Sequence, residues 1–261
     1  MRLRWDRIMT LLAIISLLAI TSVGGGAPGP TAKAAVRQDH VVLAAVCPQA
    51  REPTVVRAAP GAGRTVALTF DDGPGLWTPK VLDVLRRSGV KAAFFVIGRN
   101  AETNPGLVSA IAADGHLIGN HTWNHDPPPR GASWPRARLA NELDRTDQLL
   151  NEITGSRTCW FRPPAGILSG ATAEVRRRSL AVAMWSVDSR DWLIQKGARR
   201  DPDGELAHRI VVRATSGADQ KNPIVLLHDG GGYRGATVAA LPSIIRFYQS
   251  HGYTFVRLDG G

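Results

Sequence analysis

Two histidines and a pair of acidic residues have the types and the spacing of a catalytic metal site. His121 and His125 lie four residues apart, which places both imidazoles on one face of a helical turn. Asp71 and Asp72 follow an apolar run and point in different directions, so one can bind a cation while the other acts as a base. Two imidazoles and one carboxylate leave positions open for water and substrate. These ligands favour zinc and also suit cobalt, manganese or iron.

Three further clusters place polar side chains directly after apolar runs. Arg162 precedes two prolines, and its guanidinium can form a bidentate pair with a carboxylate. His228 ends another apolar run, and a carboxylate such as Asp191 beside it would hold the imidazole charged as a proton donor. Each cluster taken singly also fits a structural group, such as a polar turn or a histidine whose hydrogen bonds are satisfied.

Short apolar runs alternate with helical patterns from residue 64 onward, which predicts βαβ units and a parallel sheet. Strands are expected at 66–70, 92–97, 116–119, from 160, and at 181–187, 224–227 and 253–258. Helices are expected at 79–88, 105–114, 133–153, 172–178, from 201, and at 238–250. This pattern favours a (β/α) barrel, whose C-terminal mouth would gather the polar clusters. The absence of G-x-G-x-x-G after the first strand argues against a dinucleotide-binding fold.

The first 34 residues have the order of a secretory signal peptide. Three arginines precede an uncharged apolar run from Ile8 to Ile20, and Ala32-Lys33-Ala34 follows. The run is shorter than the roughly 20 apolar residues of a membrane span, which favours cleavage over an uncleaved anchor. Either alternative places the protein outside the cytoplasm. Residues 35–63, rich in Gly, Ala and Pro, are interpreted as a linker, and residues 64–261 as a single catalytic domain.

The chain of 261 residues has a formal net charge of +10. Its basic residues are spread along the sequence without a stripe or a reader motif, which argues against nucleic-acid binding. In an exported protein this charge either attracts an anionic cell envelope or belongs to a soluble surface that happens to be basic. Cys47 and Cys159 are predicted to form a disulfide in an oxidising compartment, with two separate buried thiols as the alternative.

The clusters, in this order, resemble the polysaccharide deacetylase family, the NodB-homology domain of carbohydrate esterase family 4. The motifs are T-F-D-D-G, H-T-x-x-H, R-P-P-x-G, D-x-x-D-W and L-x-H-D, and the resemblance covers approximately Arg64 to Leu258. Each motif is weak alone, but the ordered set is specific. The resemblance implies a distorted (β/α)7 barrel and a hydrolase that acts on amide bonds.

The resemblance also implies three kinds of site residue. The metal ligands are Asp72, His121 and His125. Asp71 is the general base and is oriented by Arg162, while His228 is the general acid and is tuned by Asp191. The residues at the substrate are Ala165, Trp192 and Leu226. The implied cofactor is one divalent ion, Zn²⁺ first, with Co²⁺ or another cation as alternatives. The family commonly has an aromatic residue where this chain has Ala165. The backbone N–H of Ala165 can still donate to an oxyanion, whereas the aromatic side chain that could line the sugar groove is absent.

The function implied by the resemblance is N-deacetylation of N-acetylglucosamine units in peptidoglycan or a chitin-like polymer. O-deacetylation of acetyl-xylan shares the motifs. A non-catalytic cell-wall binding module would keep the barrel, although every acid, base and ligand position here holds a competent residue. An iron oxygenase triad normally sits on a double-stranded β-helix, which this alternation of strands and helices does not predict. An acetylated polysaccharide and an anionic envelope are the expected partners, with membrane contact only if the leader is uncleaved.

Overall fold

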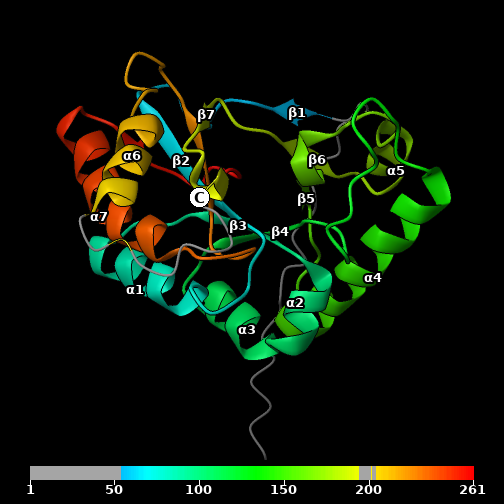
Figure 1. The fold of residues 1–261 in the computed structure, drawn as a ribbon. Coiled ribbons are helices and arrows are strands. Elements are labelled where there is room, and N and C mark those ends of the chain that lie inside the picture. The colour runs from blue at the N-terminus through cyan, green and yellow to red at the C-terminus, as the bar shows by residue number, and fades with distance from the viewer. Residues whose placement is uncertain (1–53, 194–200, 202–203) are drawn as a thin grey trace, which may run out of the picture. The chain divides into compact units, whose positions relative to one another are not determined.

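The computed structural model describes residues 54–193, 201 and 204–261, and within them one curled sheet forms the centre of the fold (Figure 1). All strand pairs are parallel, in the order β1-β6-β5-β4-β3-β2-β8-β7, with β9 paired to β2. The strands are β1 (Val55–Val56), β2 (Thr65–Asp71), β3 (Ala93–Val96), β4 (Leu117–Asn120), β5 (Trp160–Phe161), β6 (Ala181–Ala183), β7 (Val187–Asp188), β8 (Ile224–His228) and β9 (Thr254–Phe255). This arrangement confirms the predicted distorted (β/α) barrel.

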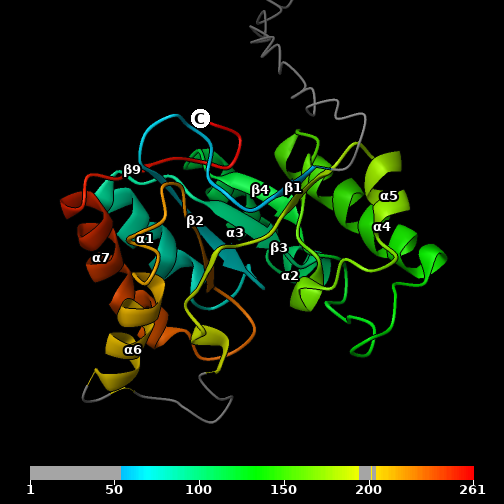
Figure 2. The same cartoon turned by 90° about the horizontal axis from the view of Figure 1, so that it is seen from above.

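Helices surround the sheet on its outer side (Figures 1 and 2). They are α1 (Thr78–Ser88), α2 (Gly98–Thr103), α3 (Pro105–Ala113), α4 (Arg136–Thr154), α5 (Thr172–Arg177), α6 (Glu205–Ala214) and α7 (Gly235–Ser250). Two short 3₁₀ turns, η1 (Pro164–Gly166) and η2 (Asp191–Leu193), follow strands on the same edge as the predicted site. The largest core cluster joins β2, β3 and β8 to α1, α3 and α7, and includes Phe70 stacked on Phe94 with ring centroids 5.1 Å apart.

The alternation of β2 sets the direction of the first acidic side chain. Val66, Leu68 and Phe70 belong to the core cluster that packs against the helices. Successive side chains of a strand point to opposite faces, so Thr69 and Asp71 face the interior of the curled sheet. All seven residues of β2 are buried, as expected for a central strand of a barrel covered on both faces.

Two predicted elements differ from the structure for identifiable reasons. The helix predicted at 133–153 begins at Arg136, because Pro135 disfavours a helical conformation in the residue before it. Trp134 instead donates from Nε1 to the carbonyl of Ile167 at 2.7 Å. The strand predicted at 181–187 is divided into β6, which pairs with β5, and β7, which pairs with β8. The division lets one segment reach two distant strands of the curled sheet.

The remaining boundaries differ by a few residues. The helix expected from 201 begins at Glu205, and the Asp201 carboxylate accepts from two backbone N–H groups of its first turn. The last helix begins at Gly235 instead of 238, and the final strand is confined to Thr254–Phe255. Residues 54–63, assigned to a linker from sequence, contribute β1, which pairs with β6.

No helix in the described part of the chain is long and apolar enough to cross a membrane. The predicted leader, residues 1–34, and Cys47 lie outside the described residues. Cleavage of the leader and the Cys47–Cys159 disulfide therefore stay predictions. Cys159 itself is 9% exposed and directly precedes β5.

Candidate metal centre and acid–base site

The end of β2 directs two adjacent carboxylates to different partners. Asp71 Oδ1 accepts a hydrogen bond from Arg162 Nη1 at 2.8 Å. Asp72 turns the chain, since its φ of 72° lies in the left-handed region. Asn100 Nδ2 donates to the Asp72 carbonyl at 2.8 Å. A Cβ added to Gly230 would lie 2.0 Å from that carbonyl oxygen, so only glycine allows the loop after β8 to approach this turn.

His121 and His125 lie on an irregular loop after β4, and the prediction of a helical turn is wrong. Thr122 and His125 have φ values of 68° and 52°, which an α-helix does not contain. The loop nevertheless brings the two imidazoles together, with ring centroids 4.9 Å apart. The two histidines singled out by their four-residue spacing therefore do lie together, but tertiary contacts rather than helical periodicity bring the rings together.

Glu142, a buried residue of α4, holds the histidine loop from behind. Its Oε2 accepts from the backbone N–H groups of Trp123 and Asn124 at 2.8 and 2.7 Å, and its Oε1 accepts from Asn124 Nδ2 at 2.7 Å. Asn120 adds a contact from the end of β4, where its Oδ1 accepts from the Thr122 N–H at 2.8 Å. These supports were missed from sequence: Glu142 reaches the loop only through the packing of α4, whereas Asn120 directly precedes the first histidine.

Asp72, His121 and His125 form a group that fits a divalent cation. Their candidate ligand atoms all lie within 4.8 Å of one another. Asp72 Oδ1 lies 3.2 Å from His125 Nε2 and 3.5 Å from His121 Nε2. This oxygen is buried, and no donor in the described residues hydrogen-bonds to it. Because an unpaired buried carboxylate oxygen is costly, the observation favours a positively charged ligand at this point.

The protonation states of the group also suit a cation. His121 Nδ1 lies 2.7 Å from the Arg162 carbonyl, which can only accept, so Nδ1 carries the proton and Nε2 is left for a ligand. Burial, followed by the charge of His121, lowers the pKa of His125, and the neutral imidazole is the form that binds metals. Burial would raise the pKa of Asp72, but the neighbouring imidazoles, His121 foremost, hold that pKa well below its ordinary value.

Arg162 is fully buried and all three of its guanidinium nitrogens are bonded. Besides its bond to Asp71, Nη1 donates to Thr69 Oγ1 at 2.8 Å, while Nε and Nη2 donate to the carbonyls of Ala183 and Met184 at 3.0 and 3.1 Å. Burial lowers the pKa of Arg162, and the charge of Asp71 opposes that shift. Since Arg162 occupies Oδ1, the carboxylate of Asp71 keeps Oδ2 for other chemistry, 3.7 Å from His121 Nε2.

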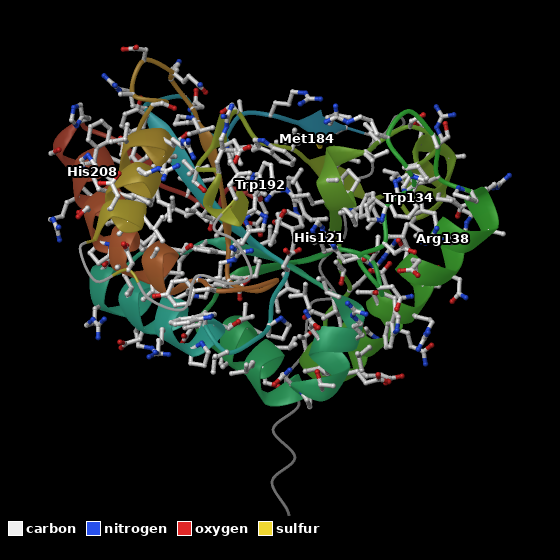
Figure 3. All side chains as sticks on the ribbon, in the orientation of Figure 1. His121, Trp134, Arg138, Met184, Trp192 and His208 are labelled. Carbon is white, nitrogen blue, oxygen red and sulfur yellow. The ribbon has the colours of Figure 1, made fainter. Side chains whose placement is uncertain are left out.

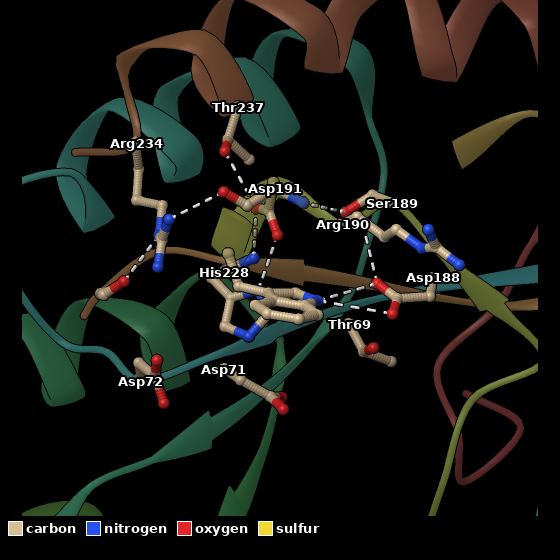
Figure 4. A network of polar contacts seen from close by, with 12 residues as sticks. Thr69, Asp71, Asp72, Asp188, Ser189, Arg190, Asp191, His228, Arg234 and Thr237 are labelled. Atoms are coloured by element: carbon tan, nitrogen blue, oxygen red, sulfur yellow. Dashed lines mark hydrogen bonds and ion pairs between the residues drawn. The ribbon is translucent and has the colours of Figure 1, made fainter. Parts of the chain in front are cut away.

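His228 and Asp191 form a buried ion pair (Figure 4). His228 Nδ1 lies 2.7 Å from Asp191 Oδ1, and Asp191 Oδ2 accepts from the His228 N–H and from Thr237 Oγ1, both at 2.9 Å. Arg234 Nη1 donates to the Asp191 carbonyl at 3.0 Å. Burial would lower the pKa of His228, but the Asp191 carboxylate raises it to about 9. In Figure 4, Asp71 and Asp72 lie on the side of His228 opposite Asp191.

A cavity of about 400 Å³ joins these groups. Eight of the ten residues predicted for the site line it: Asp71, Asp72, His121, His125, Ala165, Trp192, Leu226 and His228. The other two, Arg162 and Asp191, stand behind Asp71 and His228 and bond to them. The structure thus brings the complete predicted set together in one place.

The wall of the cavity contains further residues besides the ten predicted for the site. Arg130, Trp185 and Asp188 line it, and Asp188 accepts from Trp192 Nε1 at 3.3 Å, which orients the indole. Ala165 has a φ of 54° on η1, and no acceptor in the described part of the chain bonds to its backbone N–H. A free donor in this wall can therefore stabilise an oxygen that gains negative charge.

Comparison with known proteins identifies the family. Residues 58–181 match the polysaccharide deacetylase family. A peptidoglycan-N-acetylglucosamine deacetylase of Bacillus cereus is 37% identical over 196 residues, which are 74% of this chain, and the chain spans 66% of that relative's length. A second such deacetylase of Bacillus cereus is 36% identical over 224 residues, covering 80% of this chain and 93% of the relative.

A solved structure gives the same result. The crystal structure of a peptidoglycan N-acetylglucosamine deacetylase in complex with 4-naphthalen-1-yl-N-oxidanyl-benzamide superposes with a TM-score of 0.69 at 34% identity, covering 80% of this chain and 92% of that chain. From its motifs, its curled parallel sheet and these likenesses, the chain belongs to the polysaccharide deacetylase family.

Proposed function

We propose that this chain hydrolyses the N-acetyl groups of N-acetylglucosamine units in peptidoglycan, outside the cytoplasm and with one bound divalent metal ion. The observation that carries the proposal is the convergence of Asp72, His121 and His125 beside Asp71 and His228 in one cavity. The relatives named above are peptidoglycan deacetylases, which favours an amide in a cell-wall glycan as the substrate. The leader pattern of residues 1–34 supports export.

Asp72, His121 and His125 would hold the ion. Two imidazoles and a carboxylate match Zn²⁺ best among the common divalent cations. When bound, such an ion supplies Lewis-acid polarisation of the acetamide carbonyl and lowers the pKa of a water molecule. The loop contacts of Glu142 position the two histidines for this task.

Asp71 serves as the general base. Arg162 engages Oδ1 and fixes the carboxylate, so Oδ2 takes a proton from the attacking water. The oxygen of that water then bonds to the acetamide carbon, and negative charge moves to the carbonyl oxygen. The Ala165 N–H donates to this oxygen as its charge grows.

His228 serves as the general acid. Asp191 engages Nδ1 and keeps the imidazole charged, so Nε2–H protonates the departing sugar nitrogen while the C–N bond breaks. Leu226 and Trp192 line the cavity, where they offer apolar contacts to the acetyl methyl. The products are acetate and a free amine on the polymer.

Acetate release by the purified protein tests this proposal. Peptidoglycan, chitooligosaccharides and acetyl-xylan are compared as substrates at equal acetyl content, before and after removal of metal by a chelator. The expected result is chelator-sensitive release of acetate from peptidoglycan, and little from acetyl-xylan. Preferential release from acetyl-xylan would assign O-deacetylation instead. If the metal-loaded protein binds the wall polymer without releasing acetate, the chain is a non-catalytic binding module.

A further inference from the structure

We infer that Arg130 is a specificity-determining residue, which binds a carboxylate on the substrate glycan close to the sugar that loses its acetyl group. The inference rests on the proposed function and deepens it, because it concerns the same cavity. Its consequence is a preference for acidic glycans, in which a neighbouring sugar carries a carboxylate, over neutral polymers of N-acetylglucosamine.

Arg130 brings an uncompensated positive charge to the cavity. The side chain is exposed, and it lines the same cavity as Asp71, Asp72 and His228. No ion pair or hydrogen bond in the described residues involves its guanidinium. Most arginines near the site are engaged: Arg162 is bonded to Asp71, and Arg138 forms an ion pair with Asp126. Arg130 is therefore available to an outside acceptor.

The loop that carries Arg130 is held in place at both ends. On one side Arg138 pairs with the Asp126 carboxylate and also donates to the Asp126 carbonyl at 2.6 Å. On the other side the Trp134 N–H donates to the Ser169 carbonyl at 2.9 Å, and the Trp134 indole donates to the Ile167 carbonyl at 2.7 Å. Figure 3 shows Trp134 and Arg138 on the α4 side of the molecule, with His121 and Trp192 at its centre.

The loop is also stiff between these anchors. Pro127, Pro128 and Pro129 precede Arg130 and fix three successive φ angles. The Ala132 N–H closes a turn on the Pro129 carbonyl at 2.9 Å. Arg130 therefore loses little backbone freedom when it binds, which favours a recognition role.

The chemistry of the acceptor follows from the remaining charges of the cavity. The carboxylates of Asp71 and Asp191 are committed to Arg162 and His228, and that of Asp72 would hold the metal ion. Asp188 accepts from Trp192 and from a backbone N–H. An arginine guanidinium pairs best with a planar, bidentate acceptor. A carboxylate on a sugar next to the reacting one provides that acceptor, as the lactyl group of muramic acid does where no peptide is attached to it. A neutral N-acetylglucosamine oligomer has no such group.

The test compares two oligosaccharides of equal length in the metal-loaded protein. One alternates N-acetylglucosamine with N-acetylmuramic acid bearing free lactyl carboxylates, and the other contains only N-acetylglucosamine. Dissociation constants and kcat/KM for acetate release are measured for the wild type, Arg130→Gln and Arg130→Lys. Arg209→Gln is the matched control, because Arg209 is exposed on α6, does not line the cavity and adjoins His208, which Figure 3 shows on the far side from Trp134.

We expect Arg130→Gln to weaken binding and kcat/KM for the acidic oligosaccharide about fivefold, the upper range for a solvated ion pair, and to leave the neutral one unchanged. Arg130→Lys should recover part of the loss and Arg209→Gln should cause none. Added salt should reduce the preference of the wild type for the acidic over the neutral oligosaccharide, since salt screens exposed charges. Equal effects on both oligosaccharides, or no effect, would overturn the inference. Selective binding without acetate release from either would keep the inference and remove the proposed function.

Discussion

The backbone carbonyl of Arg162 accepts a hydrogen bond from His121 Nδ1 at 2.7 Å. The guanidinium of the same residue donates to Asp71 Oδ1 at 2.8 Å. One buried arginine therefore orients a proposed metal ligand through its main chain and the proposed base through its side chain. Because the two contacts use different groups, the base can be altered while the metal ligands keep their geometry.

Asp71→Asn should separate turnover from metal binding. Asparagine keeps an acceptor for Arg162 but does not take a proton, so kcat should fall about 10²- to 10⁴-fold. Zinc content per chain should remain that of the wild type, because Asp72, His121 and His125 are unchanged. Kinetics of acetate release and elemental analysis of the same preparation check the two expectations. Retained activity with normal zinc content would discard Asp71 as the base.

Glu142→Ala should weaken metal binding although Glu142 is not a proposed ligand. The change removes the acceptor of three hydrogen bonds that hold the histidine loop. Loss of such a support typically lowers metal affinity about 10- to 100-fold. Competition with a chromogenic chelator measures that affinity. Glu152→Ala, an exposed position on the same helix, is the control, and equal affinities in the two variants would argue against the support.

Asp191→Asn should move the alkaline limit of activity to lower pH. Burial lowers the pKa of His228, and the Asp191 carboxylate is the main influence that raises it to about 9. Without that carboxylate only the charges of Asp71 and Asp72 still oppose burial. The alkaline limb of the pH profile of kcat, which reports loss of the donated proton, should therefore move to lower pH by at least about one unit. A pH profile of kcat measures the shift, and an unchanged alkaline limb would show that His228 is not the donor.

The same ion pair should stabilise the fold in a defined pH range. The pKa of His228 in the folded protein, about 9, lies above the ordinary histidine value of 6.5. The contribution to the free energy of unfolding is therefore fully present below pH 6.5 and is lost as pH rises through about 9. Urea unfolding across this range should show the loss in the wild type, and a smaller one in Asp191→Asn.

The predicted Cys47–Cys159 disulfide should be detectable by its thiols and by its effect on stability. Denatured protein should show no reactive thiol before reduction and two after it. A bridge that closes the loop from Cys47 to Cys159 stabilises a fold by about 4–5 kcal/mol in the chain-entropy treatment. Reduction should therefore lower the free energy of unfolding by up to that amount. Two thiols titrated without a reductant would refute the pairing.

The sequence was most informative where a strand ends. Residues 66–70 formed a largely apolar run that predicted β2, and the acidic pair after it was expected at the mouth of a parallel barrel. The same logic placed Arg162 after β5 and His228 at the end of β8. These positions depend on local pattern and on the handed, parallel arrangement of βαβ units, which sequence periodicity captures.

Features that depend on tertiary contact were beyond this reasoning. Glu142 is one of several acids on α4, and only the packing of that helix against the histidine loop distinguishes it. Arg130 lines the cavity on the proline loop before α4, but it belongs to none of the motifs and so was not predicted as a site residue. The left-handed conformations of Thr122 and His125 likewise follow from the contacts that hold their loop.

Stoichiometric restoration of activity by zinc would show that catalysis depends on one ion held by Asp72, His121 and His125. The protein is stripped of metal by a chelator, and acetate release from peptidoglycan is measured as zinc is added in fractions of one ion per chain. We expect full recovery at one ion per chain for the wild type, and no recovery for Asp72→Ala or His125→Ala although both stay folded. Undiminished acetate release from the stripped protein, or normal restoration of either variant, would rule out catalysis by a metal ion held at these three residues.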